Sequence, residues 1–285
     1  MPHDNSPHPA SINRDSKDYW NKRAATFTRY ATEDYELWLM NLLSPAMGET
    51  ILDMGCATGT LALPLARGGH YVHACDFAEA MLTILDQRAA AENLPITSHL
   101  LAWDEDWNRA GLGENSVDFA FALRSLMSDH TLSRISKLDA TARVKAAVVV
   151  PNSLPPSSDP RLLTYLGRKA KRPSTVREVL RALRYLGRIP VTATTNTYRP
   201  MRFNSFDEAR ADLRRLARPE PFTAREQRLF DAYARDHFIE VPAVPPANGL
   251  SNDHSDSPQT QWVLNYPLPV VWTFIGWRTD GSEWE

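Results

Sequence analysis

The chain has 285 residues, of which 43% are hydrophobic and 23% charged, and its formal net charge is −2. This balance is typical of a globular protein that forms a core unaided, so it excludes a disordered chain or one that depends on disulfides. The two cysteines, Cys56 and Cys75, form no CxxC pair, which argues against a metal site and favours a reducing compartment. The N-terminus lacks a signal-peptide pattern, and no apolar run is long enough to cross a bilayer. We therefore predict a cytoplasmic protein with no bound metal and no membrane partner.

The first 150 residues predict a sheet domain preceded by short helices. Residues 1–15 are polar and are expected to be disordered, and residues 16–43 have the apolar spacing of two short helices. Residues 44–150 alternate short apolar runs with amphipathic segments, which predicts parallel βαβ units and a doubly wound α/β sheet. The expected strands are Thr50–Met54, Tyr71–Cys75, Ile96–Ala102, Val117–Leu123 and Ala146–Val150.

The second half of the chain predicts an insertion followed by a return to the sheet. Residues 151–260 begin and end with loops rich in proline and polar residues, and the composition between them is mainly helical, with a β-rich stretch at Val191–Phe203. Residues 261–285 contain the apolar run Val270–Trp277, which we expect to be a buried strand that completes the core sheet.

The segment Ile51–Gly59, with the sequence ILDMGCATG, predicts a strand, an acid and a tight turn before a helix. Gly55 and Gly59 tolerate unusual backbone dihedrals and allow a ligand to approach closely at the carboxyl end of the strand. The spacing differs from the pyrophosphate fingerprint GxGxxG, and Asp53 suits a cationic group such as an ammonium better than a phosphate. The alternative is an ordinary strand–helix turn without a ligand.

Asp76 directly follows the second expected strand. An acid at this position can accept hydrogen bonds from both hydroxyls of a ribose. The alternative is that Asp76 caps the N-terminus of the expected helix Ala78–Glu92. The two roles are compatible.

The string ILDMGCATGTLALPLARGGHYVHACDFAEAML resembles the first two motifs of class I S-adenosylmethionine-dependent methyltransferases, which have a Rossmann-like, seven-stranded and mostly parallel sheet. Ala57 stands where the family usually has glycine. The resemblance covers roughly residues 18–150 and the C-terminal strand. It implies methyltransferase activity, with S-adenosylmethionine as the cofactor and S-adenosylhomocysteine as the product.

By this resemblance the cofactor site lies along the ends of the first four strands. Asp53 and the turn would hold the methionine moiety, Asp76 the ribose, and Asp104 the adenine amino group, with Trp103 covering the ring. For Trp103 and Asp104 the alternatives are a core tryptophan and a solvated turn. The full set implied for the cofactor is Asp53, Gly55, Cys56, Ala57, Thr58, Gly59, Asp76, Phe77, Met81, Trp103, Asp104 and Arg124.

The sequence offers fewer candidates for binding the molecule that accepts the methyl group. The aromatic N-terminal residues, Tyr19 and Tyr30 among them, resemble the lid helix of this family or belong to the core, and with Ser125 they are candidates for substrate binding. The tetrapeptide N/D-P-P-Y/F, found in members that methylate base and amide nitrogens, is replaced here by Leu-Arg-Ser-Leu. His130 is the nearest candidate for a general base, although a surface or capping role is the alternative. Positioning alone accelerates methyl transfer, so no catalytic residue is required.

Residues 161–188 carry nine basic residues and one acid, Glu178. Three interpretations remain: a solvated helix face, a surface that attracts an anionic substrate, and a platform for nucleic-acid phosphates. We therefore expect methyl transfer to a small molecule, an anionic one included. The alternatives are an RNA methyltransferase that uses this segment and a cofactor-binding protein without methyl transfer. The sequence does not distinguish a monomer from a homodimer.

Overall fold

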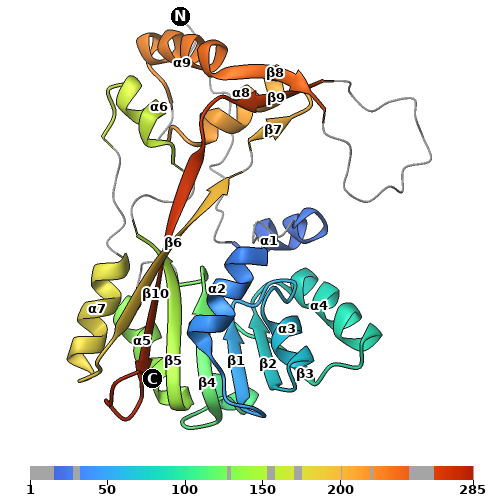
Figure 1. The fold of residues 1–285 in the computed structure, drawn as a ribbon, viewed down its shortest axis with the longest axis vertical. Coiled ribbons are helices and arrows are strands. Elements are labelled where there is room, and N and C mark those ends of the chain that lie inside the picture. Colours follow the sequence, from blue (N-terminus) through green and yellow to red (C-terminus); the bar gives the residue numbers. More distant parts are fainter. Residues whose placement is uncertain are drawn as a thin grey trace, which may run out of the picture. The chain divides into compact units, whose positions relative to one another are not determined.

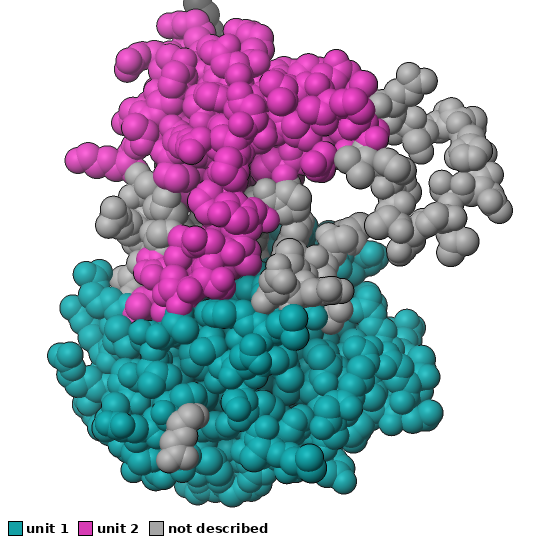
Figure 2. All heavy atoms as spheres, in the orientation of Figure 1, with its two compact units in different colours: residues 1–150, 177–193, 274–285 teal, residues 151–176, 194–273 magenta. Residues whose placement is uncertain are grey.

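The computed structural model describes residues 16–27, 33–126, 130–152, 158–169, 175–199, 201–218, 221–243 and 260–284. The chain divides into two compact units, coloured separately in Figure 2. Unit 1 comprises residues 1–150, 177–193 and 274–285, and unit 2 comprises residues 151–176 and 194–273. No helix within the described ranges has both the length and the apolar character needed to span a membrane.

A seven-stranded sheet has the order β3-β2-β1-β4-β5-β10-β6. Its first five strands in chain order run parallel, and the order reverses between β1 and β4, the topological switch point where open α/β sheets bind ligands. Strand β10 is antiparallel to β5, since Asn152 donates to the carbonyl of Val271 while Thr279 donates to that of Val144. The strands are β1 (Thr50–Met54), β2 (Tyr71–Asp76), β3 (Ile96–Leu100), β4 (Val117–Leu123), β5 (Ala142–Pro151), β6 (Val191–Arg199) and β10 (Leu268–Arg278).

Among the helices of unit 1, α4 and α5 bury an apolar face against this sheet. Figure 1 shows α3 and α4 close to β1–β3, at the edge formed by β3. The elements are α1 (Lys17–Arg23), η1 (Ala24–Thr26), α2 (Glu33–Leu43), α3 (Ala62–Arg67), α4 (Glu79–Ala91), η2 (Trp107–Ala110), α5 (Thr131–Thr141) and α7 (Thr175–Tyr185).

A buried acid joins α5, the segment after α7 and β10. Asp139 receives two hydrogen bonds of 2.9 Å from Arg188 and one of 2.8 Å from the indole of Trp277. Both charges of this pair are therefore satisfied where they are shielded from water. Arg188, one of the nine basic residues of the segment 161–188, therefore has a structural role in unit 1.

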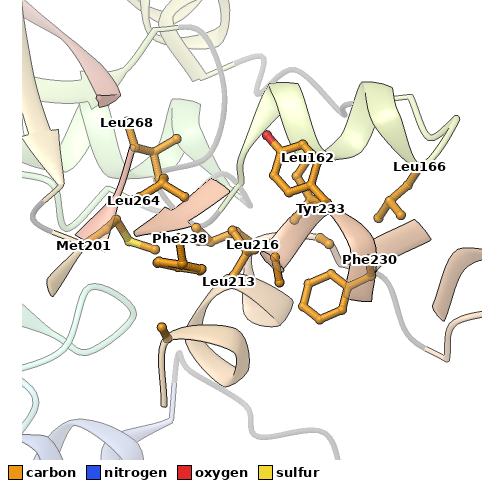
Figure 3. Close-up of a cluster of buried hydrophobic side chains, with 13 residues drawn as sticks. Leu162, Leu166, Met201, Leu213, Leu216, Phe230, Tyr233, Phe238, Leu264 and Leu268 are labelled. Carbon is orange, nitrogen blue, oxygen red and sulfur yellow. The ribbon is translucent and has the colours of Figure 1, made fainter. Parts of the chain in front are cut away.

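Unit 2 has its own apolar core and a small sheet of order β7-β9-β8. Figure 3 shows this core, in which Leu162, Leu213, Phe230, Tyr233 and Phe238 come together from three helices and one strand. The elements are α6 (Pro160–Tyr165), β7 (Arg202–Phe203), α8 (Phe206–Arg215), α9 (Ala224–His237), β8 (Phe238–Pro242) and β9 (Thr260–Leu264).

The predicted doubly wound, mostly parallel sheet is confirmed, and β1 and β4 have the predicted bounds. The expected insertion, residues 151–260, is divided differently: residues 177–193 belong to unit 1, and residues 261–273 belong to unit 2. Strand β8 and the small sheet were not predicted. Residues 1–15, expected to be disordered, lie outside the described residues.

Candidate functional site

The turn after β1 lies at the switch point of the sheet, beside the end of β2. The backbone N–H groups of Gly55 and Cys56 both donate to the carbonyl of Cys75, at 2.7 and 3.0 Å. Gly55 and Gly59 have φ values of +85° and +88°, and Ala57 between them has +49°. Three residues of this turn therefore adopt left-handed conformations, which glycine tolerates and alanine adopts only at a cost.

Both glycines are also enclosed by protein side chains. A Cβ on Gly55 would lie 2.2 Å from Cβ of Ser125, and a Cβ on Gly59 would lie 2.5 Å from Cδ1 of Leu85. We expected these positions to leave room for a ligand. Their Cα atoms instead let the segment after β4 and the helix α4 pack closely against the turn, and Ser125 also donates a 2.5 Å hydrogen bond to the carbonyl of Met54.

Asp76 links the end of β2 to the turn. One carboxylate oxygen accepts the N–H of Ala57 and the other that of Ala78, both at 2.9 Å. Burial raises the pKa of Asp76, while these bonds and one from Phe77 act in the opposite direction. Asp76 is thus held by backbone donors just before α4, which begins at Glu79, but makes no capping hydrogen bond to that helix, and its carboxylate keeps part of its acceptor capacity for a ligand.

Asp53 is 2% exposed and lies behind the turn. Burial and the nearby carboxylate of Asp76 raise the pKa of Asp53 to about 8, while a hydrogen bond from the N–H of Ala62 lowers it. The neighbouring charge that acts on Asp53 is thus another acid, which leaves the pair short of a positive partner. This arrangement favours a cationic ligand over a phosphate.

Residues 51–145 match the family model of a methyltransferase domain. A protein of Haemophilus influenzae that has no assigned function is 30% identical over 128 residues, which are 44% of this chain and 46% of that protein. Demethylmenaquinone methyltransferase of Clavibacter sepedonicus is 30% identical over 105 residues, 36% of this chain and 42% of the enzyme. The alignments thus span less than half the length of these curated relatives.

Phosphoethanolamine N-methyltransferase 2 of Haemonchus contortus, solved with S-adenosyl-L-methionine, shares the fold with a TM-score of 0.50 at 14% identity. That likeness covers 94% of this chain and 58% of the other. Residues 51–145 of this chain are thus similar to a methyltransferase domain, and the chain shares the fold of a solved methyltransferase.

The N-terminal segment of unit 1 packs over the start of α4. The side chain of Asn21 accepts the N–H of Ala80 at 3.0 Å, so α1 provides the cap that α4 lacks in its own sequence. Ala24 and Met81 belong to one buried cluster, against which Trp20 and other apolar residues pack. Met81 is therefore covered by protein, 1% exposed, and a cofactor contact would require this segment to move.

Tyr19, a substrate-binding candidate, lies in α1 with its ring 5.3 Å from that of Trp20, centre to centre. Tyr30, the other tyrosine candidate, lies outside the described residues. Cys56 and Thr58 belong to the turn and are 3% and 2% exposed, whereas Phe77, which follows β2, is half-buried. The cysteines Cys56 and Cys75 are both free and buried.

Trp103 joins the segments that follow β3 and β4. Its indole N–H donates to the carbonyl of Ser125 at 3.2 Å, and the guanidinium of Arg134 lies 5.8 Å from the centre of its ring. Asp104 lies 3.5 Å from Arg134 and its side chain is 75% exposed. The carboxylate of Asp104 is thus directed at α5 in this conformation, and its predicted contact with adenine stays a prediction.

Arg124 follows β4 with a φ of +57°, and its guanidinium lies 5.5 Å from the ring centre of Tyr35 in α2. Burial raises the pKa of Tyr35 to about 12, and the charge of Arg124 acts against that shift. His130 occupies the N-cap position of α5, where its side chain is exposed and makes no capping hydrogen bond. Within the described part of the chain, no contact links His130 to the turn, so its role as a base stays a prediction.

Sequence reasoning missed the residues that support the turn from a distance. Asn21 and Leu85 were not singled out, and neither was Arg88, which donates to the carbonyl of Thr58 at 3.1 Å. Leu85 lies on the predicted apolar face of α4, which was the one available signal. Nothing adjacent in the sequence identifies Asn21 as the cap of a helix that begins 58 residues later.

Proposed function

We propose that the protein transfers a methyl group from S-adenosylmethionine to a small molecule. The observation that supports this most directly is the position of Asp76, whose carboxylate lies against the turn after β1 at the switch point of the sheet. Burial and Asp76 raise the pKa of the neighbouring acid Asp53, and a cation bound beside Asp53 would favour its ionised form. S-adenosylmethionine carries a sulfonium and an ammonium, and its ribose offers two hydroxyls, so these groups match the two acids.

In this proposal the chain binds and orients the reactants. Asp76 accepts the ribose hydroxyls with the acceptor capacity that its backbone donors Ala57, Phe77 and Ala78 leave available. Asp53 and the turn 55–59 hold the methionine end. When bound, the cofactor supplies an electrophilic methyl group, and alignment of the acceptor with it provides much of the acceleration. A dedicated base is not required by this chemistry.

A small acceptor fits the distribution of charge better than a nucleic acid does. The basic residues between 161 and 188 are divided between the two units, and Arg168 and Arg188 form ion pairs of 2.7 and 2.9 Å with Glu226 and Asp139. A phosphate platform requires its cations to be available together. Unit 2, with a core of its own, is our candidate for the part that selects the acceptor.

Calorimetric titration of the full chain with S-adenosylmethionine, S-adenosylhomocysteine and NAD tests the cofactor. We expect the first two to bind and NAD not to bind. Asp76→Ala should weaken binding by about 1–3 kcal/mol, or roughly five- to 150-fold in Kd. Asp86→Ala changes an exposed acid on the neighbouring helix α4 and is the matched control.

Because Asp76 also holds two backbone N–H groups, thermal unfolding of Asp76→Ala must confirm that the variant is folded at the titration temperature. Asp76→Asn keeps one acceptor oxygen, so its affinity for S-adenosylmethionine should lie between those of the wild type and of Asp76→Ala. Binding of NAD alone, or unchanged affinity for S-adenosylmethionine in a folded Asp76→Ala, would overturn the proposal.

A further inference from the structure

A hollow of about 530 Å³ lies on unit 2. It is formed by α6 and the end of α9, two elements that Figure 1 shows within this unit. Its volume is in the range of pockets that accept small organic molecules. The lining residues are Pro160, Arg161, Thr164, Tyr165, Tyr233 and His237.

Three of the six residues that line the hollow are aromatic. The ring of Tyr165 lies 5.1 Å from that of Tyr233, and the ring of His237 lies 4.2 Å from Tyr233, centre to centre. Tyr266 supports His237 from behind in an edge-on contact at 5.3 Å. Tyr165 is 45% exposed, so part of this aromatic surface remains available to a planar ligand.

Arg161 supplies a positive charge at the edge of the hollow. Its guanidinium lies 4.5 Å from the centre of the Tyr266 ring. Arg168 and Arg210 of unit 2 pair with acids, whereas no ion pair of Arg161 occurs among the described residues. A guanidinium held on an aromatic face presents its N–H donors in a fixed plane, which suits a carboxylate.

The hydrogen bonds of His237 determine which of its ring nitrogens can accept a hydrogen bond from a ligand. Nδ1 of His237 lies 3.1 Å from Oδ1 of Asn265, whose Nδ2 donates to the carbonyl of Asp236. Oδ1 can only accept, so in the neutral imidazole Nδ1 carries the hydrogen. This leaves Nε2 as an acceptor on a residue that lines the hollow. A ligand hydroxyl is the complementary group.

A buried network holds the wall rigid. The side chain of Asp159 is fully buried, accepts the N–H groups of Arg161 and Leu162, and accepts a hydrogen bond from the hydroxyl of Tyr266. The hydroxyl of Tyr233 lies 2.7 Å from that of Tyr266 and donates to it, because Tyr266 uses its own hydrogen on Asp159. Burial is the main cause that raises the pKa of Tyr233 to about 12. These fixed side chains form a preorganised site.

We propose that this hollow is a binding site for a small planar aromatic acid that carries a hydroxyl, with Arg161 on the carboxylate, Tyr165 against the ring and supported by the buried Tyr233, and His237 on the hydroxyl. The site goes beyond the proposed methyl transfer, since its residues lie in unit 2 and do not include the candidate cofactor residues. A quaternary ammonium, which aromatic rings also bind, is disfavoured by the charge of Arg161.

Titration of the full chain, without added cofactor, tests the proposal by calorimetry with 4-hydroxybenzoate as the probe. Three comparison compounds each remove one feature: benzoate lacks the hydroxyl, 4-hydroxybenzamide lacks the negative charge, and trans-4-hydroxycyclohexanecarboxylate lacks the aromatic ring. We expect 4-hydroxybenzoate to bind most tightly and each comparison compound to lose about three- to thirtyfold.

Two variants assign the contacts. Arg161→Gln should weaken 4-hydroxybenzoate by about tenfold or more and leave the affinity for 4-hydroxybenzamide nearly unchanged. His237→Phe keeps an aromatic ring and should remove the preference for 4-hydroxybenzoate over benzoate. Arg225→Gln, at an exposed position of α9, is the control and should change neither affinity.

No binding of 4-hydroxybenzoate at millimolar concentration, or equal binding by wild type and Arg161→Gln, would overturn the site. Titration of the same variants with S-adenosylmethionine separates this result from the proposed function. If 4-hydroxybenzoate does not bind, the titration with S-adenosylmethionine is unaffected. If S-adenosylmethionine does not bind, the binding of 4-hydroxybenzoate is unaffected.

Discussion

Both units contain a buried aspartate that accepts backbone N–H groups at the start of a helix, yet the two acids act in different surroundings. In unit 1, Asp76 lies beside Asp53, so two acids share one region and the pKa of each is raised by burial. In unit 2, Asp159 is fully buried but receives the hydroxyl of Tyr266 in addition to its two backbone donors. The acids of unit 1 thus favour a positive ligand, whereas that of unit 2 is satisfied by the protein itself.

The hydrogen-bond partners of a buried acid indicate whether it belongs to a binding site. A buried acid whose hydrogen bonds are complete, such as Asp159, stabilises its own surroundings and organises neighbouring side chains. Two adjacent acids with no cation acting on Asp53 are costly until a ligand supplies the charge. Variants in both units test this difference between the acids of unit 1 and Asp159.

The largest effect is expected at the turn of unit 1. Gly55→Ala would place a Cβ 2.2 Å from Cβ of Ser125 at a φ of +85°, so overpacking and backbone strain combine. We expect a loss of about 3–5 kcal/mol in the free energy of unfolding, measured by denaturant titration. Ser125→Gly in the same chain should recover the overpacking part alone. If the double variant is no more stable than Gly55→Ala, the contact with Ser125 is not the cause.

A second effect follows from the raised pKa of Asp53. In the unfolded chain an aspartate ionises near its ordinary value of about 3.9, whereas burial and Asp76 raise the pKa in the folded protein to about 8. The folded state therefore binds the extra proton between these values, so Asp53 lowers stability as pH rises from about 4 to about 8. Asp53→Asn should remove this loss, on the order of 2–4 kcal/mol at pH 8, and approach wild type near pH 4.

The comparison for Asp53→Asn is made by unfolding both proteins across this pH range and subtracting the two curves, so that all other titrating groups cancel. A difference that does not grow with pH would contradict the protonated Asp53. The same difference should shrink if S-adenosylmethionine is present, because a cation beside Asp53 lowers its pKa.

In unit 2, Tyr266→Phe removes the hydroxyl that Asp159 accepts and leaves that buried oxygen without its donor. We expect a loss of about 1–3 kcal/mol in the free energy of unfolding. Tyr198→Phe, which changes a 61% exposed tyrosine of the same unit, should change stability by well under 1 kcal/mol and is the control. Equal effects of the two variants would mean that Asp159 does not depend on Tyr266.

The smallest expected effect is an increase in stability, in contrast to the losses expected for Gly55→Ala and Tyr266→Phe. Ala57 has a φ of +49°, so Ala57→Gly should relieve strain and stabilise the protein by about 1 kcal/mol, seen as a higher Tm. The extra freedom that glycine has in the unfolded chain reduces this gain. Thr58→Gly, at a position of the same turn without a positive φ, should instead destabilise. A lower Tm for Ala57→Gly would show that its strain is negligible.

The core of unit 1 was predictable because its signals are local. Each βαβ segment carries its own apolar run, turn residues and helix, so β1 and β4 were predicted with their bounds. Strand β8 was missed because α9 ends at His237 and β8 begins at Phe238, with no proline or glycine to mark the change. The helix α5 and strand β5 join in the same way at Thr141 and Ala142, which is why β5 begins before its predicted start.

The site was predictable only where its residues are neighbours in the chain. Asp53, the turn and Asp76 lie within one βαβ segment, whereas the contacts of Ser125 with Gly55 and of Asn21 with Ala80 depend on tertiary packing. The hollow of unit 2 had no sequence signal, because Arg161, Tyr233 and Tyr266 come from three distant segments. A basic segment could be recognised from the sequence, but its division between two units could not.

The order in which the strands leave the ribosome differs from their order in the sheet. β10 lies between β5 and β6, and its residues 274–278 complete unit 1 only after all of unit 2 has been synthesised. During translation the edge of β5 therefore stays uncovered while more than a hundred residues are added, and such an edge can pair with other chains. A nascent chain stalled before β10 should need chaperone protection, whereas the finished protein closes this edge with its own strand.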